Sequence, residues 1–148
     1  MLERDDVWLS SRLDLLWEKH FSDVQRLNPV RICFKGKWKN KFGHIRLLKN
    51  KETEIVVNGM FKSFDIPDFI LELTIAHELV HYSHGFQSPH PQLYTHPHQG
   101  SVVNQDLKKR GFHEHLRQER KWIKEVWRPH VQKVFAQRKR VLKRRFWF

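Results

Sequence analysis

Residues 64–85 read FDIPDFILELTIAHELVHYSHG, and this stretch decides which fold we expect for the chain. Ser63 or Asp65 stands near a helix cap, Pro67 falls in the first turn, and Gly85 stands where a helix would stop. Apolar residues cover more than one side of such a helix, which is typical of a helix buried at the centre of a domain. The stretch therefore predicts a central helix that holds its polar side chains in fixed orientations.

Within this helix, His77, Glu78 and His81 form the pattern His-Glu-x-x-His. With 11 histidines in 148 residues, about 0.05 such matches are expected by chance. Residues four apart lie on one helical face, so both imidazoles can reach a single metal ion. Glu78 would then accept a proton from a water molecule at the metal, and the resulting hydroxide would attack a polarised carbonyl. The pattern predicts a zinc site for amide hydrolysis without a covalent intermediate.

A catalytic zinc ion takes three protein ligands and keeps one position for water, so a third ligand must come from elsewhere in the chain. His84 lies seven residues beyond His77 and is not expected to reach the same ion. His90 and His96 lie in a Pro-rich loop, where we expect them to be exposed, whereas His98 stands at the start of the next helix. We favour His98, and His96 stays open. The more distant candidates are His113, Glu114 and His115.

The elements around the central helix predict an α+β fold. Residues 5–21 have the spacing of an amphipathic helix. The segments NPVRICFKG, GHIRLL and TEIVVNGM are typical of three strands in a small, mainly antiparallel sheet. After the Pro-rich loop, residues 100–111 predict a further helix, and a long helix that Pro129 should bend follows to the C-terminus.

Composition limits the compartment and the kinds of metal site. A chain of 148 residues has the length of one ordinary domain. Its single cysteine, Cys33, excludes an internal disulfide and a multi-cysteine zinc ribbon, so histidine and carboxylate remain as metal ligands. The N-terminus is acidic where a signal peptide would be basic, and no apolar run approaches the ~18 residues that span a bilayer. We expect a soluble protein in the cytoplasm, nucleoid or nucleus, neither secreted nor bound to a membrane.

The net charge of +12 is concentrated near the C-terminus. From residue 130 onward there is no acidic residue, and the basic residues are Lys133, Arg138, Lys139, Arg140, Lys143, Arg144 and Arg145. DNA is the expected partner of this concentration of positive charge, because phosphates that are neutralised by the protein release condensed counterions. The alternative is a solvated basic helix that only packs on its own protein.

Residues 10–112 resemble the SprT-like (Spartan-like) zinc metallopeptidases. The likeness rests on a short helix, a three-stranded sheet, the run ELTIAHELVHYSHG, a variable loop, and a histidine that leads a helix ending in RGF. It implies a zincin-like fold with one zinc ion per chain, held by His77, His81 and His98, and Glu78 as the catalytic glutamate. Gly111 matches a late glycine of the family, whereas Gln99 stands where the family usually has glycine.

The resemblance also implies two domains with different functions. Residues 1–116 would form the metallopeptidase domain, and residues 117–148 a basic helical extension in place of the zinc ribbon that many relatives carry. The implied substrate is a protein bound or crosslinked to DNA, the implied DNA is single-stranded or contains a junction, and the implied role is repair of DNA–protein crosslinks. We expect a monomer.

Two alternatives remain beside this hypothesis. A gluzincin-type peptidase, unrelated to DNA, would use a glutamate as third ligand, for which Glu114 or Glu119 could serve. A nucleic-acid-binding module would carry a structural or degenerate zinc site and act through its basic helix. Glu78 disfavours the second alternative, because a structural site needs no general base.

Overall fold

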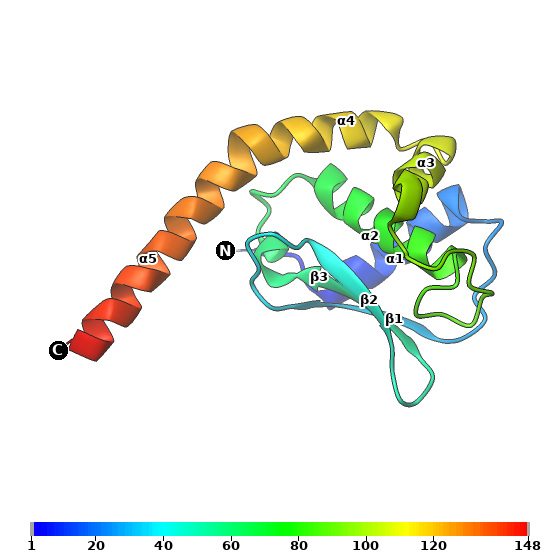
Figure 1. The fold of residues 1–148 in the computed structure, drawn as a ribbon, viewed down its shortest axis with the longest axis horizontal. Coiled ribbons are helices and arrows are strands. Elements are labelled where there is room, and N and C mark those ends of the chain that lie inside the picture. The colour runs from blue at the N-terminus through cyan, green and yellow to red at the C-terminus, as the bar shows by residue number, and fades with distance from the viewer. Residues whose placement is uncertain (1, 148) are drawn as a thin grey trace. The chain divides into compact units, whose positions relative to one another are not determined.

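A computed structural model describes residues 2–147, with side chains up to residue 141 (Figure 1). The chain divides into two compact units, Met1–His115 and Leu116–Phe148. The regular elements of the first unit, in chain order, are α1 (Asp6–His20), β1 (Val30–Lys35), β2 (Gly43–Leu47), β3 (Thr53–Asn58), α2 (Asp68–Ser83) and α3 (Val102–Lys109). Helix α4 (His113–Trp122) begins in the first unit and continues into the second. Among the described residues, no helix has the length and apolar character needed to cross a bilayer.

The sheet has three strands, as predicted, but it is mixed and not mainly antiparallel. Its strand order is β1-β3-β2, with β3 parallel to β1 and antiparallel to β2. A tight turn after Leu47 makes β2 and β3 antiparallel neighbours, whereas β3 enters the sheet between β2 and β1 and thus runs parallel to β1. All six residues of β3 are buried, as expected for a central strand.

Helices α1 and α2 contact each other and cover the sheet, because α1 contacts β1 and α2 contacts both β2 and β3. The Asp5 side chain caps α1 by accepting a hydrogen bond of 2.8 Å from the Trp8 amide. The buried stripe of α1 consists of Leu9, Leu13, Leu16 and Trp17. The predicted amphipathic helix is therefore present, and it forms part of the core that supports α2.

The start of α2 differs from the prediction, since neither Ser63 nor Asp65 caps it. Pro67 occupies the N-cap position and forms no side-chain cap hydrogen bond. The buried Arg4 guanidinium orders this connection instead, donating to the carbonyls of Phe61, Ser63 and Ile66 and to the Asp68 carboxylate. An N-terminal residue thus fixes the start of the central helix, which local sequence does not reveal.

The end of α2 agrees with the prediction, because Gly85 follows its last turn in a left-handed conformation with φ +78°. The Gly85 amide donates to the Tyr82 carbonyl, and the next amide, of Phe86, donates to the His81 carbonyl. A Cβ atom at Gly85 would collide with the backbone of Pro91 and Gln92. Both the φ angle and the close chain approach therefore require glycine here.

The second unit contains the end of α4, a π-helical turn over Ile123–Trp127 and the long helix α5 (Arg128–Trp147). The π turn directly precedes Pro129, the residue predicted to perturb this helix. Proline lacks an amide donor and displaces the preceding turn, and π turns commonly accommodate such an interruption. The predicted long C-terminal helix is confirmed.

We expect Gly85→Ala to lower the free energy of unfolding by about 3 kcal/mol or more, since it combines a left-handed alanine with overpacking against the backbone. Gly100→Ala is the matched control: Gly100 has φ +58° but no heavy atom within 4 Å of an added Cβ. Gly100→Ala should lower the free energy of unfolding by only about 1–2 kcal/mol. Urea unfolding of both variants tests this, and equal losses would contradict a close approach at Gly85.

Candidate metal centre

The structure brings three imidazole nitrogens together at one point of the first unit. His77 and His81 project from α2, and His98 lies just before the short 3-10 turn Gln99–Ser101 that leads into α3. The Nε2 atom of His81 lies 3.1 Å from that of His77 and 3.0 Å from that of His98, and the third side of the triangle is 3.4 Å. Among the described residues, this is the cluster whose ligand atoms could share one metal ion.

Hydrogen bonding among the three histidines cannot account for this triangle. In a neutral imidazole each ring nitrogen is either a donor or an acceptor. With three Nε2 atoms in mutual contact, at least one pair must therefore consist of two donors or two acceptors. A cation removes this conflict, because all three nitrogens can present lone pairs to it. Tetrahedral zinc with Zn–N bonds of about 2.0–2.1 Å would place its nitrogen ligands about 3.3–3.4 Å apart, close to the observed sides.

The protonation states of the two helical histidines also suit a metal ion. Burial, with the neighbouring His98, lowers the pKa of His77 to about 4. Burial, reinforced by His77, His98 and His84, lowers the pKa of His81 to about 3. Both rings are thus neutral at pH 7, which is the form that binds metals. The Nδ1 atom of His81 is buried and has no hydrogen-bond partner among the described residues.

Glu78 also lies on α2, and its carboxyl group lies close to the start of strand β2. Its side chain is buried, and burial raises its pKa to about 8, against an opposing effect of the Lys41 charge. A Cβ atom at Gly43 would lie 3.7 Å from Glu78 Oε1 and only 2.8 Å from the Val56 carbonyl oxygen. Val56 therefore disfavours a side chain at the start of β2, and the backbone of Gly43 lies close to this carboxyl group. A nearby cation would favour the ionised form of Glu78.

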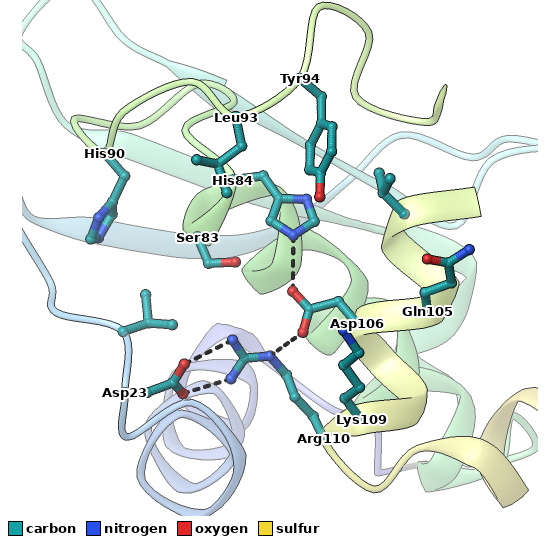
Figure 2. Close-up of a pocket in the computed structure, with 12 residues that line it drawn as sticks. Asp23, Ser83, His84, His90, Leu93, Tyr94, Gln105, Asp106, Lys109 and Arg110 are labelled. Atoms are coloured by element: carbon teal, nitrogen blue, oxygen red, sulfur yellow. Dashed lines mark hydrogen bonds and ion pairs between the residues drawn. The ribbon is translucent and has the colours of Figure 1, made fainter. Parts of the chain in front are cut away.

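A network of charged side chains fixes α3, the helix that follows His98, to the rest of the unit (Figure 2). His84 Nε2 lies 2.9 Å from the Asp106 carboxylate, which joins α2 to α3. Arg110 donates to Asp106 at 2.9 Å and to Asp23 at 2.7 Å and 3.1 Å, and also to the His20 carbonyl. These contacts connect α1, α2 and α3, so they restrict where the chain can place His98.

The same residues line a pocket of about 400 Å³ beside the network (Figure 2). Its wall also includes Tyr94, whose ring packs edge-on against His84 with centroids 5.1 Å apart. Both carboxylates of the pocket, Asp23 and Asp106, are paired with Arg110. The pocket therefore offers no unpaired acidic group, and we assign it a structural part in holding α3.

The structure separates the alternatives that the sequence left open for the third ligand. His98 belongs to the cluster, whereas His96 is exposed and outside it. Neither Glu114 nor Glu119 belongs to a group among the described residues that could hold a metal ion. His84 lies outside the cluster, as its distance from His77 suggested, and it pairs with Asp106. His90, expected to be exposed, is instead half-buried, with Nε2 lying 2.7 Å from the Gln25 carbonyl oxygen.

The predicted DNA-binding residues lie in the second unit. Lys133, Arg138, Lys139 and Arg140 are exposed on α5. The side chains of Lys143, Arg144 and Arg145 lie outside the described residues. Sequence reasoning missed Asp106 and Arg110, which lie within α3 and at its C-terminal end, and Gly43 at the start of β2. No local spacing signals Asp106, because its partner His84 lies 22 residues away in sequence.

The cluster predicts that His98→Ala abolishes stoichiometric metal binding, because two ligands cannot complete the site. His96→Ala is the matched control, since it removes an exposed histidine two positions away and should retain one metal ion per chain. Purified proteins incubated with zinc and desalted would be measured by elemental mass spectrometry. Metal loss from the His96 variant alone would show that the ligand assignment is wrong.

Comparisons with family models, curated proteins and solved structures find no match to this chain. No family is therefore established by similarity. The geometry of the three histidines and Glu78, and the distribution of charge along the chain, are the features that bear on function.

Proposed function

We propose that the chain is a zinc-dependent endopeptidase of the SprT-like type that acts on proteins bound or crosslinked to DNA. The observation that carries the proposal is the convergence of His77, His81 and His98, with Glu78 on the same helix as two of them. Three ligands and one open position are the composition of a catalytic zinc site. His98 is exposed, so the cluster is reachable from solvent on its side.

In this proposal each residue has a distinct role. His77, His81 and His98 would hold the metal through Nε2. Zinc, when bound, would supply Lewis acidity to a substrate carbonyl and to a water molecule. Glu78 accepts a proton from that water and later delivers it to the leaving amine, so the same carboxyl group serves as base and then as acid.

Burial of Glu78 favours a catalytic centre over a structural zinc site. Among the described residues no cationic side chain forms an ion pair with it, and burial alone raises the pKa of its carboxyl group. An unpaired buried carboxyl group lowers stability, and such groups concentrate at functional sites. A structural site has no use for a general base, whereas hydrolysis requires one.

The DNA part of the proposal rests on charge. The chain carries a net charge of +12, and residues 130–148 contain seven basic and no acidic residues. The exposed basic side chains of α5 are free to approach phosphates, and Arg138 also packs over the Phe135 ring at 4.9 Å. Recruitment by DNA would confine the activity of an accessible peptidase to DNA-bound proteins.

We expect Glu78→Gln to retain its metal and its fold but to lose proteolysis by about 10²- to 10⁴-fold, the usual contribution of general acid–base catalysis. Cleavage of a DNA-binding protein substrate and metal content would be measured on the same preparations. Glu72→Gln is a matched control, because Glu72 lies on α2 but is outside the cluster. Normal cleavage by the Glu78 variant would refute the mechanism.

We also expect proteolysis to require DNA, through charges in residues 130–148. A variant with glutamine at Arg138, Lys139, Arg140, Lys143, Arg144 and Arg145 should lose DNA stimulation and keep its metal. Its DNA affinity should depend less steeply on salt, by about 0.7–0.9 log units per lost phosphate contact. Cleavage would be compared with and without single-stranded DNA for both proteins. Equal activity in all four cases would remove the DNA-dependent part of the proposal.

A further inference from the structure

A second basic segment, separate from α5, lies in the first unit. Residues 35–42 read KGKWKNKF and connect β1 to β2; we name this segment the lysine loop. A lysine stands at every second position and no acidic residue is present. All four side chains are exposed: Lys35, Lys37, Lys39 and Lys41.

Local ion pairs offset the charges of Lys35, Lys37 and Lys41 in the lysine loop only in part. Lys35 pairs with Glu54 at 3.2 Å, but Arg46 of β2 pairs with the same carboxylate at 2.9 Å. Among the described residues, no carboxylate lies within ion-pair distance of Lys37 or Lys41. The loop and its neighbour Arg46 therefore carry a local excess of positive charge, which favours an anionic partner.

The lysine loop is also ordered before any partner binds. The Asn58 side-chain amide donates to the carbonyls of Trp38 and Lys41, at 2.8 Å and 2.9 Å. The Trp38 ring packs directly over Gly36, and the Lys41 ammonium lies 4.8 Å from the centre of that ring. Because these contacts fix the backbone, binding would immobilise little besides the lysine side chains.

The lysine loop leads directly to the metal centre. It continues into Gly43, whose added Cβ would lie 3.7 Å from Glu78 Oε1. The charge of Lys41 acts on the Glu78 carboxyl group, so the two groups are electrostatic neighbours. An anion held by the loop would therefore lie beside the reaction centre.

We infer that the lysine loop binds the phosphate backbone of single-stranded nucleic acid next to the metal centre. Lysine ammonium groups contact phosphates as point charges and do not select bases, so binding would be independent of sequence. A half-exposed tryptophan among lysines, as at Trp38, is typical of surfaces that bind single strands. The inference rests on the proposed function for the choice of nucleic acid, and it places a DNA contact in the first unit as well as on α5.

The test uses full-length chains carrying Glu78→Gln, so that its outcome does not depend on peptidase activity. Lys37→Gln with Lys39→Gln is the test pair, and Lys41 is kept because it packs over Trp38 and its charge acts on Glu78. Lys49→Gln with Lys51→Gln is the matched control, because these exposed lysines lie in the turn at the opposite end of β2. Thermal unfolding would establish that both variants are folded.

Binding of fluorescein-labelled oligothymidylate would be measured by anisotropy over a range of salt concentrations. We expect the test pair to weaken binding and to reduce the slope of log K against log salt by about 1.4, which is two contacts at about 0.7 each. The control pair should leave both quantities unchanged. An unchanged slope in the test pair, or an equal change in the control pair, would overturn the inference.

An acidic peptide is the alternative class of partner for the lysine loop. A competition experiment distinguishes it from nucleic acid. Concentrations of the two competitors are compared per negatively charged group. Unlabelled oligothymidylate should displace the labelled strand at a lower concentration than polyglutamate, because polyglutamate offers no bases to Trp38. Equal displacement by polyglutamate would overturn the assignment to nucleic acid. A failed peptidase assay would leave these binding results intact, so the two proposals fail separately.

Discussion

The contact among three imidazole nitrogens is the constraint on which the rest of the first unit depends. Nitrogens only 3.0–3.4 Å apart cannot all be satisfied by one another, so the arrangement is stable only around a shared cation or at a cost to folding. To hold two of these nitrogens, α2 must not rotate, and eleven buried residues of this helix prevent rotation. To supply the third nitrogen, the chain must leave α2 after Ser83 and return to this helix at His98.

Contacts at both ends of the loop after α2 bring the chain back to this helix. Gly85 turns the chain at a position where a side chain would strike Pro91 and Gln92. Beyond His98, the Asp106 contact with His84 attaches α3 to α2, and Arg110 attaches α3 to the end of α1. The elements at the two ends of the loop therefore help to determine where His98 lies, together with contacts of the loop itself such as that of His90 with the Gln25 carbonyl.

Local pattern was sufficient to predict α2, its end at Gly85 and the placement of His77 and His81 on one helical face, because these depend on residues close in sequence. The third histidine was only narrowed to His96 or His98, because it lies 17 residues beyond His81. Pairing of β1 with β3 was not predictable in this way, since it joins strands separated by a third strand. The run of buried residues in β3 lacked the alternation of an outer strand, and that absence was the available signal for a central position. Arg4 could not be anticipated, because its partners at Phe61 to Asp68 come near it only in the folded chain.

Positive charge lies on both units, and it bears on how the proposed hydrolytic centre would select its substrates. Each basic segment offers only a few phosphate contacts, and a few contacts give weak binding at physiological salt. Two weak sites on one chain bind a long polyanion more tightly than either alone, because binding at the first raises the effective concentration at the second. With the lysine loop next to Glu78, a strand bound to this loop would also hold its attached protein close to the three histidines.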